Sequence, residues 1–90
     1  MRQLKAKRDE SEKEIIAALK GIGAVYVSIS MKDVPDLLCS YRGHTFLVEC
    51  KSGKAKLKPG QEAFKDKWQG VVLVARCAED IINFTNTLDR

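Results

Sequence analysis

Apolar residues recur at helical spacing near the start of the chain and at strand spacing directly afterwards. Between positions 15 and 22 they repeat every three or four residues, and Gly21 and Gly23 then interrupt the pattern. This spacing predicts a first helix over residues 10–21. Residues 24–30 alternate apolar and small polar side chains and are rich in β-branched types, so we expect a strand there. The helical apolar positions are Ile15, Ile16, Leu19 and Ile22.

Two further β-type runs cover residues 36–41 and 45–51, separated by Arg42, Gly43 and His44. The glycine in this short connector suits a hairpin turn. We therefore expect the two runs to be antiparallel neighbours in one sheet.

The second half of the chain returns to helical spacing. A helix is predicted over residues 61–69, with Pro59 in a place that a first helical turn tolerates and Gly70 at its end. Residues 71–75 form a continuous apolar run, typical of a strand covered on both faces, and residues 79–88 have the pattern of an amphipathic final helix. The order αβββαβα predicts an α/β fold with a mixed sheet flanked by helices.

Length and charge narrow the picture. Ninety residues without an internal repeat indicate one domain over residues 1–90, with a basic, flexible arm over residues 1–9. The formal net charge is +4, and basic residues gather at positions 2–8 and 51–67. This balance favours a polyanionic partner, with nucleic acid as the first candidate. A solvated charged surface that keeps a small protein in solution is the alternative.

Cysteine usage and hydropathy bear on where the protein works. Cys39, Cys50 and Cys77 are too widely spaced for a CxxC metal motif and suit small core residues of a reducing compartment. No apolar run approaches the ~20 residues of a membrane span, and the first residues are charged rather than signal-like. We therefore expect a cytoplasmic protein that does not contact a membrane.

Charged residues interrupt two of the predicted strands. Glu49 and Lys51 stand two apart on one strand, so they share a face, about 6.6 Å apart, while Cys50 points to the other. Asp36 opens the neighbouring strand, and the hairpin returns Glu49 to its vicinity. Converging carboxylates need a positive partner, and Mg²⁺ is the usual one among oxygen ligands. A surface ion pair on an edge strand is the alternative, but it leaves the interruption of apolar strands unexplained.

PDLL at residues 35–38 followed by VECK at residues 48–51 resembles the motif of the PD-(D/E)XK nuclease superfamily. The element order is similar to the restriction-endonuclease-like core of that superfamily. The ordered set of first-helix glutamate, VPD, ECK and Gln61 most closely resembles the virus-type replication-repair nuclease (VRR-NUC) family, and archaeal Holliday junction resolvases are similar in outline. The likeness covers residues 12–80. Lys32 and Asp33 depart from it, since a glycine-rich turn often stands there in the family.

The resemblance implies roles for several residues. Asp36, Glu49 and the backbone carbonyl of Cys50 are expected to bind Mg²⁺ or Mn²⁺, and Lys51 and Gln61 to position the attacking water. A metal ion bound by these residues would be the place where the phosphodiester bond is hydrolysed.

A first-helix carboxylate near the metal is also implied, and Glu10, Glu12 and Glu14 are available. At about 100° per residue, Glu12 falls within the apolar stripe while Glu10 and Glu14 lie on the far side. We therefore expect Glu12 to reach the metal, directly or through water. A glutamate favoured by the helix dipole is the alternative.

Gln61 lies on the same helix face as Phe64 and Trp68, so its amide is expected to project toward the sheet. The alternative is a first-turn glutamine that satisfies free backbone N–H groups. Trp68 itself is expected in the core rather than as a platform for base stacking.

The remaining candidates concern DNA. Lys54, Lys56 and Lys58 follow the ExK strand in a segment expected to be flexible and suited to phosphate contact. Ser30, predicted to end the first strand, is a further candidate for a phosphate hydrogen bond. His44 is expected to be an exposed turn residue without a catalytic role.

Together these features predict a Mg²⁺- or Mn²⁺-dependent, structure-specific endonuclease acting on branched DNA such as Holliday junctions or flaps. The resemblance implies a bacterial or phage-infected cell. We expect a homodimer, because one chain offers a single ExK site and two subunits related by a two-fold axis match the symmetry of a four-way junction; two successive visits by one subunit are the alternative. We expect residues 81–88 to form the dimer interface, unless they pack on the sheet of their own chain. The alternative functions are a non-catalytic nucleic-acid-binding module with the same fold, a sequence-specific restriction-type nuclease and an RNA-directed nuclease.

Overall fold

The computed structural model describes residues 9–88, so the basic run at residues 2–8 lies outside the described residues. The elements follow one another in the expected order, with three helices and four strands. They are α1 (Ser11–Ile22), β1 (Val25–Ser28), β2 (Leu37–Tyr41), β3 (His44–Cys50), α2 (Pro59–Lys67), β4 (Val72–Ala75) and α3 (Ala78–Asn86).

The four strands form one sheet in the order β1-β2-β3-β4. β1 and β2 are antiparallel, as are β2 and β3, whereas β4 runs parallel to β3. The hairpin between β2 and β3 turns at Arg42 and Gly43, whose φ angles of 51° and 85° are both positive. Glycine tolerates such angles without strain. The mixed sheet and the antiparallel hairpin are confirmed.

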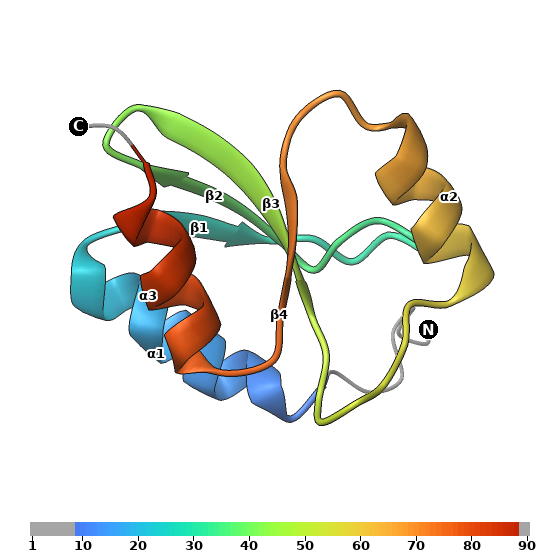
Figure 1. Ribbon diagram of the computed structural model, residues 1–90, viewed down its shortest axis with the longest axis horizontal. Coiled ribbons are helices and arrows are strands. Elements are labelled where there is room, and N and C mark those ends of the chain that lie inside the picture. Colours follow the sequence, from blue (N-terminus) through green and yellow to red (C-terminus); the bar gives the residue numbers. More distant parts are fainter. Residues whose placement is uncertain (1–8, 89–90) are drawn as a thin grey trace.

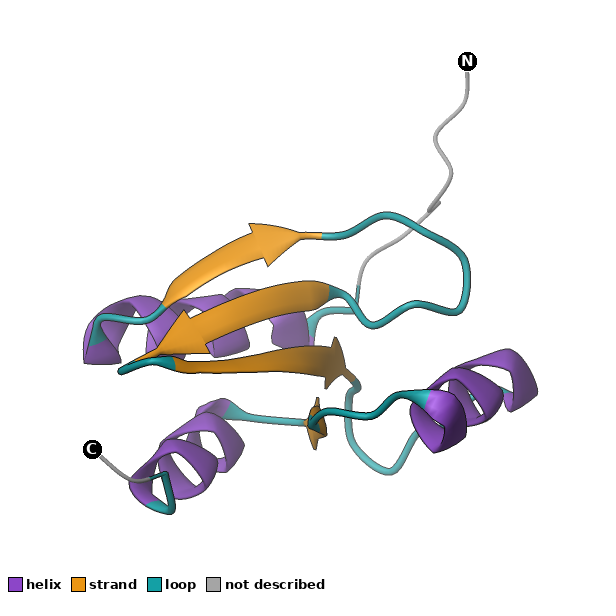
Figure 2. Cartoon of the chain, turned by 90° about the horizontal axis from the view of Figure 1, so that it is seen from above, coloured by secondary structure: helices purple, strands orange, loops and turns teal. Residues whose placement is uncertain are grey.

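One face of the sheet carries the hydrophobic core. Helices α1 and α3 lie side by side against this face, as Figures 1 and 2 show. Residues at alternate positions of the strands meet the apolar stripes of both helices there. The fully buried apolar members are Ile15, Leu19, Leu37, Cys39, Phe46, Val48, Cys50, Ala75 and Ile81.

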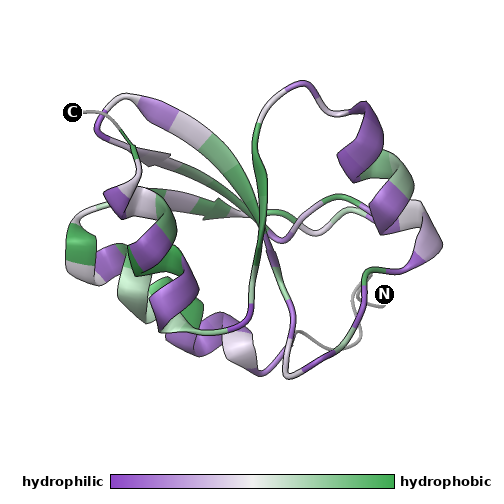
Figure 3. Cartoon of the chain, viewed as in Figure 1, coloured by the Kyte–Doolittle hydropathy of each residue, from purple (hydrophilic) through white to green (hydrophobic). Residues whose placement is uncertain are grey.

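Helix α2 lies apart from the other two helices, beside the loop between β1 and β2 (Figure 1). It is largely hydrophilic (Figure 3), and it contains no buried residue. Trp68, directly after it, is 47% exposed and stacks on Phe64 with 5.3 Å between ring centroids. The expectation that Trp68 belongs to the core is therefore wrong, because α2 does not pack on the sheet along its length.

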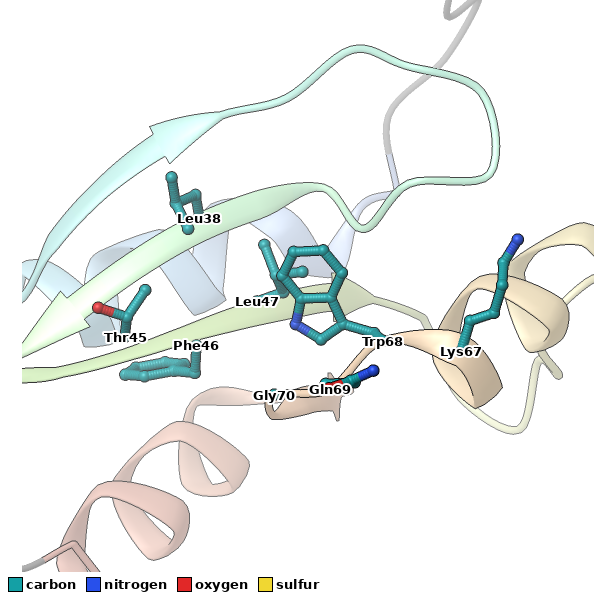
Figure 4. A pocket seen from close by; sticks show the side chains of 8 residues that line it. All are labelled: Leu38, Thr45, Phe46, Leu47, Lys67, Trp68, Gln69 and Gly70. Atoms are coloured by element: carbon teal, nitrogen blue, oxygen red, sulfur yellow. The ribbon is translucent and has the colours of Figure 1, made fainter.

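The second face of the sheet is largely open. Val25 and Val27 on β1 are 64% and 55% exposed, and Leu38, the cross-strand partner of Val27, is 40% exposed. A hollow of about 490 Å³ lies on this face. Figure 4 shows Trp68 beside Leu47 among the residues that line it. Apolar side chains on this face of the sheet are therefore exposed to solvent, from β1 to the end of α2.

Two further expectations change at the C-terminal end. The first three residues of β4 are only half-buried, so this edge strand is not covered on both faces as its apolar run suggested. Ile81 is fully buried, and Phe84 and Leu88 pack against the core of their own chain. Residues 81–88 therefore pack on their own chain, which was the alternative to the dimer interface expected for them. No helix within residues 9–88 is long and apolar enough to cross a membrane.

Candidate metal centre

All buried charged side chains of residues 9–88 belong to the site expected from the sequence. Glu12, Asp36, Glu49 and Lys51 are each less than 9% exposed. Burying an ionised group costs free energy unless a partner compensates it. The structure joins them in two groups, Glu12 and Asp36 beside Cys50, and Glu49 with Lys51.

Glu12 comes from the first turn of α1 and faces inward. It is 7% exposed, whereas Glu10 and Glu14 are exposed. This burial confirms the prediction, made from the helical spacing, that Glu12 is the glutamate that faces inward. Glu14 instead reaches α3, where its Oε2 accepts a hydrogen bond from the backbone N–H of Ala78 (2.7 Å).

Asp36 stands directly before β2, where the chain joins the sheet. Its backbone oxygen accepts a hydrogen bond from the N–H of Ile29 (2.8 Å), which extends the pairing of β1 and β2 by one step. Its Oδ2 accepts from the backbone N–H of Cys50 across the hairpin (2.8 Å). The carboxylate is therefore held against the backbone of the ExK segment.

Glu49 and Lys51 share a face of the sheet, as their spacing predicted. Lys51 Nζ lies 3.6 Å from Glu49 Oε2. Gln61, in the first turn of α2, donates from Nε2 to the same Oε2 (3.2 Å) and accepts from the backbone N–H of Lys58 at Oε1 (2.8 Å). Gln61 thus projects toward the sheet, as expected. It also satisfies a free backbone N–H of the first turn, which was the alternative.

The side chain of Cys50 was not expected at the site, yet it lies there. A carboxylate oxygen of Glu12, one of Asp36 and the thiol sulfur of Cys50 all lie within 4.8 Å of one another, and all three residues are buried. Burial raises the pKa of the Cys50 thiol, and the carboxylates around it raise it further. The signal available in the sequence was the alternation itself, which turns Cys50 toward α1 and thus toward Glu12.

Asp9 is a second residue that the sequence analysis missed. Its Oδ1 accepts hydrogen bonds from the backbone N–H and the hydroxyl of Ser11, at 3.1 and 3.0 Å, and from the hydroxyl of Ser52. Burial acts to raise the pKa of Asp9, but the hydrogen bonds from Ser52 and Ser11 and the charge of Lys51 outweigh it and lower the pKa. Asp9 therefore ties the start of α1 to the loop after β3.

The candidate DNA-contacting lysines follow the ExK segment directly. Lys54, Lys56 and Lys58 are exposed in the loop between β3 and α2. The loop is less free than expected, because Arg76 Nη1 donates to the carbonyls of Gly53 (2.8 Å) and Ala55 (2.7 Å). These bonds fix the middle of the loop against the end of β4.

Two other candidates occupy different places from those expected. Ser30 lies beyond the end of β1, exposed, and lines a hollow with Lys58 and Gln61. His44 is the first residue of β3 and is half-buried rather than an exposed turn residue, because the turn needs only the two residues before it.

Three of the buried residues could hold a cation. The donors of Glu12, Asp36 and Cys50 lie within 4.8 Å of one another, and Glu49 is not part of that group. Carboxylate oxygens are ligands that suit a hard divalent cation such as Mg²⁺ or Mn²⁺.

Comparison with known proteins adds nothing to this assignment, since no family model, no curated protein and no solved structure matches the chain.

Proposed function

We propose that the chain is a Mg²⁺- or Mn²⁺-dependent endonuclease that hydrolyses phosphodiester bonds in branched DNA. The observation that carries the proposal is the burial of Glu12, Asp36, Glu49 and Lys51 together within residues 9–88. A binding module needs charges on its surface, where they meet phosphates. Hydrolysis needs them inside, where a metal and a water molecule are held in a fixed geometry.

Asp36, Glu49 and the backbone carbonyl of Cys50 would hold the metal, with Glu12 contributing directly or through water. The hydrogen bond from Cys50 N–H to Asp36 Oδ2 supports this grouping, because it joins two of the donors across the hairpin. When bound, the metal supplies a Lewis acid for the phosphate and lowers the pKa of a coordinated water.

Lys51 and Gln61 would position the nucleophile. Both contact the same oxygen of Glu49. The Gln61 amide nitrogen has two N–H groups, and the one not given to Glu49 can hold a water or a phosphate oxygen. The bond from Lys58 N–H fixes the amide orientation, so this donor stays aimed at the site.

The lysine loop supports DNA as the substrate. Lys54, Lys56 and Lys58 are exposed on a loop that continues directly from Lys51. Such side chains contact phosphates without reading bases, which suits recognition of DNA shape rather than sequence. Ser30 lies beside Lys58 and would add a hydroxyl donor.

We infer that the functional unit is a homodimer. One chain offers a single ExK site, so paired cuts in a four-way junction need either two subunits or two successive visits by one subunit. Two subunits related by a two-fold axis match the symmetry of such a junction.

The test is cleavage of a four-way junction, a flap, a splayed arm and a matched duplex, each as DNA and as RNA, with Mg²⁺, Mn²⁺ or Ca²⁺. We expect cleavage of a branched DNA with Mg²⁺ or Mn²⁺. Asp36→Asn and Glu49→Gln should each lower the rate by ~10²-fold or more, because each removes a metal charge. Glu10→Gln, which removes an exposed carboxylate, is the matched control and should retain the wild-type rate.

DNA binding measured by gel shift in Ca²⁺ separates catalysis from binding. Both site variants should still bind, since the basic surface is intact. Binding without cleavage by the wild-type chain would favour the non-catalytic module. A fully active Glu49→Gln variant at saturating Mg²⁺ would refute the assigned site.

A further inference from the structure

The proposed nuclease uses the backbone carbonyl of Cys50, which leaves its thiol without a role. Cys50 is 2% exposed, and Glu12 and Asp36 are each 7% exposed. The thiol sulfur and one oxygen of each carboxylate lie within 4.8 Å of one another. Cys50 and Asp36 are also joined through the Cys50 backbone N–H (2.8 Å), so two of the three donors are already held together.

This mixed set differs in chemistry from a site for Mg²⁺. Magnesium takes oxygen ligands, whereas zinc binds thiolate and carboxylate together in a tetrahedron. Zinc–sulfur and zinc–oxygen bonds of about 2.3 and 2.0 Å set the donors ~3.3–3.5 Å apart. The donors of Glu12, Asp36 and Cys50 therefore need to close by at most ~1.5 Å. Rotation about the side-chain bonds of Glu12 and Cys50 covers such a distance.

We propose that Glu12, Asp36 and the thiol of Cys50 form a binding site for a thiophilic divalent cation, of which Zn²⁺ is the biological example. Three ligands come from the protein and water fills the fourth position. On binding, the sulfur–hydrogen bond breaks, a sulfur–zinc bond forms and the proton passes to solvent. No oxidant or reductant is needed.

The consequence for activity rests on the proposed function. Zinc held by Glu12 and Asp36 occupies two carboxylates that the catalytic metal requires. Bound zinc therefore excludes Mg²⁺ and inhibits cleavage. The same three residues would make the enzyme sensitive to the zinc level of the cell.

Cadmium is the direct probe, because a cadmium–thiolate bond absorbs in the ultraviolet. The full chain, kept reduced with a phosphine, is titrated with Cd²⁺, and Zn²⁺ is then added in competition. We expect a saturable charge-transfer band with one cadmium per chain that zinc abolishes. Cys50→Ser and Cys50→Ala should lose the band and weaken zinc binding, measured by calorimetry, by on the order of 100-fold.

Cys39 provides the matched control. It is 1% exposed, lies on β2 facing the same core, and is not part of the carboxylate cluster. Cys39→Ser should retain the cadmium band, whereas Glu12→Gln, which keeps the thiol and removes one carboxylate, should weaken zinc binding. Circular dichroism of each variant excludes loss of the fold, and Glu12→Gln tests the site even where a Cys50 variant does not fold.

The outcomes separate the two proposals. A Cys50-dependent band in a chain that cleaves no DNA would support the zinc site and refute the nuclease. Cleavage by a wild-type chain that shows no band, or a band lost equally in Cys39→Ser, would overturn the zinc site alone. Inhibition by zinc, with each variant compared to its own rate in Mg²⁺, should weaken in Cys50→Ala and persist in Cys39→Ser.

Discussion

Single residues of α1 have distinct tasks although they share a side-chain type. Glu12 is buried at the candidate metal centre, Glu14 accepts a hydrogen bond from Ala78 at the start of α3, and Glu10 is exposed. A carboxylate at a helix N-terminus is favoured by the free N–H groups and the helix dipole there. The position of a glutamate on the helix thus separates a place at the candidate metal centre from a contact between helices.

We expect Glu12→Gln to lower the cleavage rate by ~10²-fold or more, because it removes a metal charge. The free energy of unfolding of this variant should stay close to that of the wild type, because glutamine keeps the size and shape of glutamate. Glu14→Gln should retain activity and lose about 0.5–1 kcal/mol, because it weakens the contact with α3. Cleavage assays and urea unfolding of the two variants, with Glu10→Gln as the neutral control, measure the contrast. A rate that depends on Glu14 instead would show that the helical phase is wrong.

At the scale of elements, Asp9 joins the beginning of α1 to the loop after β3. The pKa of this carboxyl lies below its ordinary value of 3.8, as the hydrogen bonds from Ser52 and Ser11 and the charge of Lys51 together outweigh the effect of burial. A group whose pKa is lowered by folding stabilises the folded state fully above its ordinary pKa. That contribution is lost as the pH falls through the lower, folded value.

Asp9→Asn should therefore lower the free energy of unfolding at neutral pH, and the difference from wild type should shrink below about pH 4. Because Asp9 is only partly buried, we expect an effect of ~1 kcal/mol at most. Urea unfolding between pH 2 and 7 measures the difference. Glu10→Gln is the control, because it removes a neighbouring charge that makes none of these hydrogen bonds. A stability difference between Asp9→Asn and wild type that stayed constant across the pH range would contradict the role given to Asp9.

The start of α2 and the loop between β1 and β2 meet at Gly60. A Cβ on Gly60 would overlap the carboxylate of Asp33, whose φ of 67° marks a turn that few side chains adopt. The absence of a side chain at Gly60 lets this loop approach α2, and Gln61 is the next residue. This contact joins the start of α2 to the loop between β1 and β2, although the helix does not pack on the core.

Gly60→Ala should cost up to about 1 kcal/mol of stability, because the carboxylate of Asp33, at the end of its side chain, must turn away from α2. In an Asp33→Gly background, where the obstacle is absent and the positive φ is easily adopted, the cost should fall by more than ~0.5 kcal/mol. Double-mutant cycles from urea unfolding measure the coupling. Gly21→Ala is the control: nothing lies within 4 Å of its Cβ, so it should stabilise α1 by about 0.5–1 kcal/mol. Additive costs of the Gly60 and Asp33 changes would show that the contact has no energetic role.

At the scale of the whole molecule, helices cover one face of the sheet and leave the other face largely open. The open face carries Val25, Val27 and Leu38, and Trp68 lies at its border. Exposed apolar patches of several hundred Å² mark interaction surfaces in monomeric folds. If the functional unit is a homodimer, this face is a better interface than residues 81–88, whose apolar side chains are used within the chain.

Two leucine-sized residues on different faces allow a matched comparison. Leu38 on the open face is 40% exposed, and Ile82 on α3 is 41% exposed. Light scattering of the wild type should return about twice the 10.1 kDa chain mass. Leu38→Lys should reduce the mass to that of one chain, because it places a charge in the apolar contact, and Ile82→Lys should not. Dissociation by the Ile82 change alone would return the interface to α3, and a monomeric wild type would remove the dimer.

Much of this architecture is local in origin, and the sequence by itself determined it. Periodicity predicted every helix and strand within a few residues, because the side chains that repeat at 3.6 or 2 positions are the ones that a small core must bury. The same geometry selected Glu12 over Glu14 and placed Glu49 and Lys51 on one face. These conclusions depend only on how a side chain leaves its own helix or strand.

Tertiary structure alone decided what the elements do to one another. Trp68 and β4 are apolar in sequence, yet they remain partly exposed, because the packing of α1 and α3 leaves the other face of the sheet open. Cys50 lies beside Glu12 and Asp36 because α1 packs against β3. Asp9 contacts Ser52 because the start of α1 lies next to the loop after β3. Contacts between residues far apart in the chain follow from how the elements pack. Spacing along the sequence records which face a residue occupies, and it does not record what covers that face.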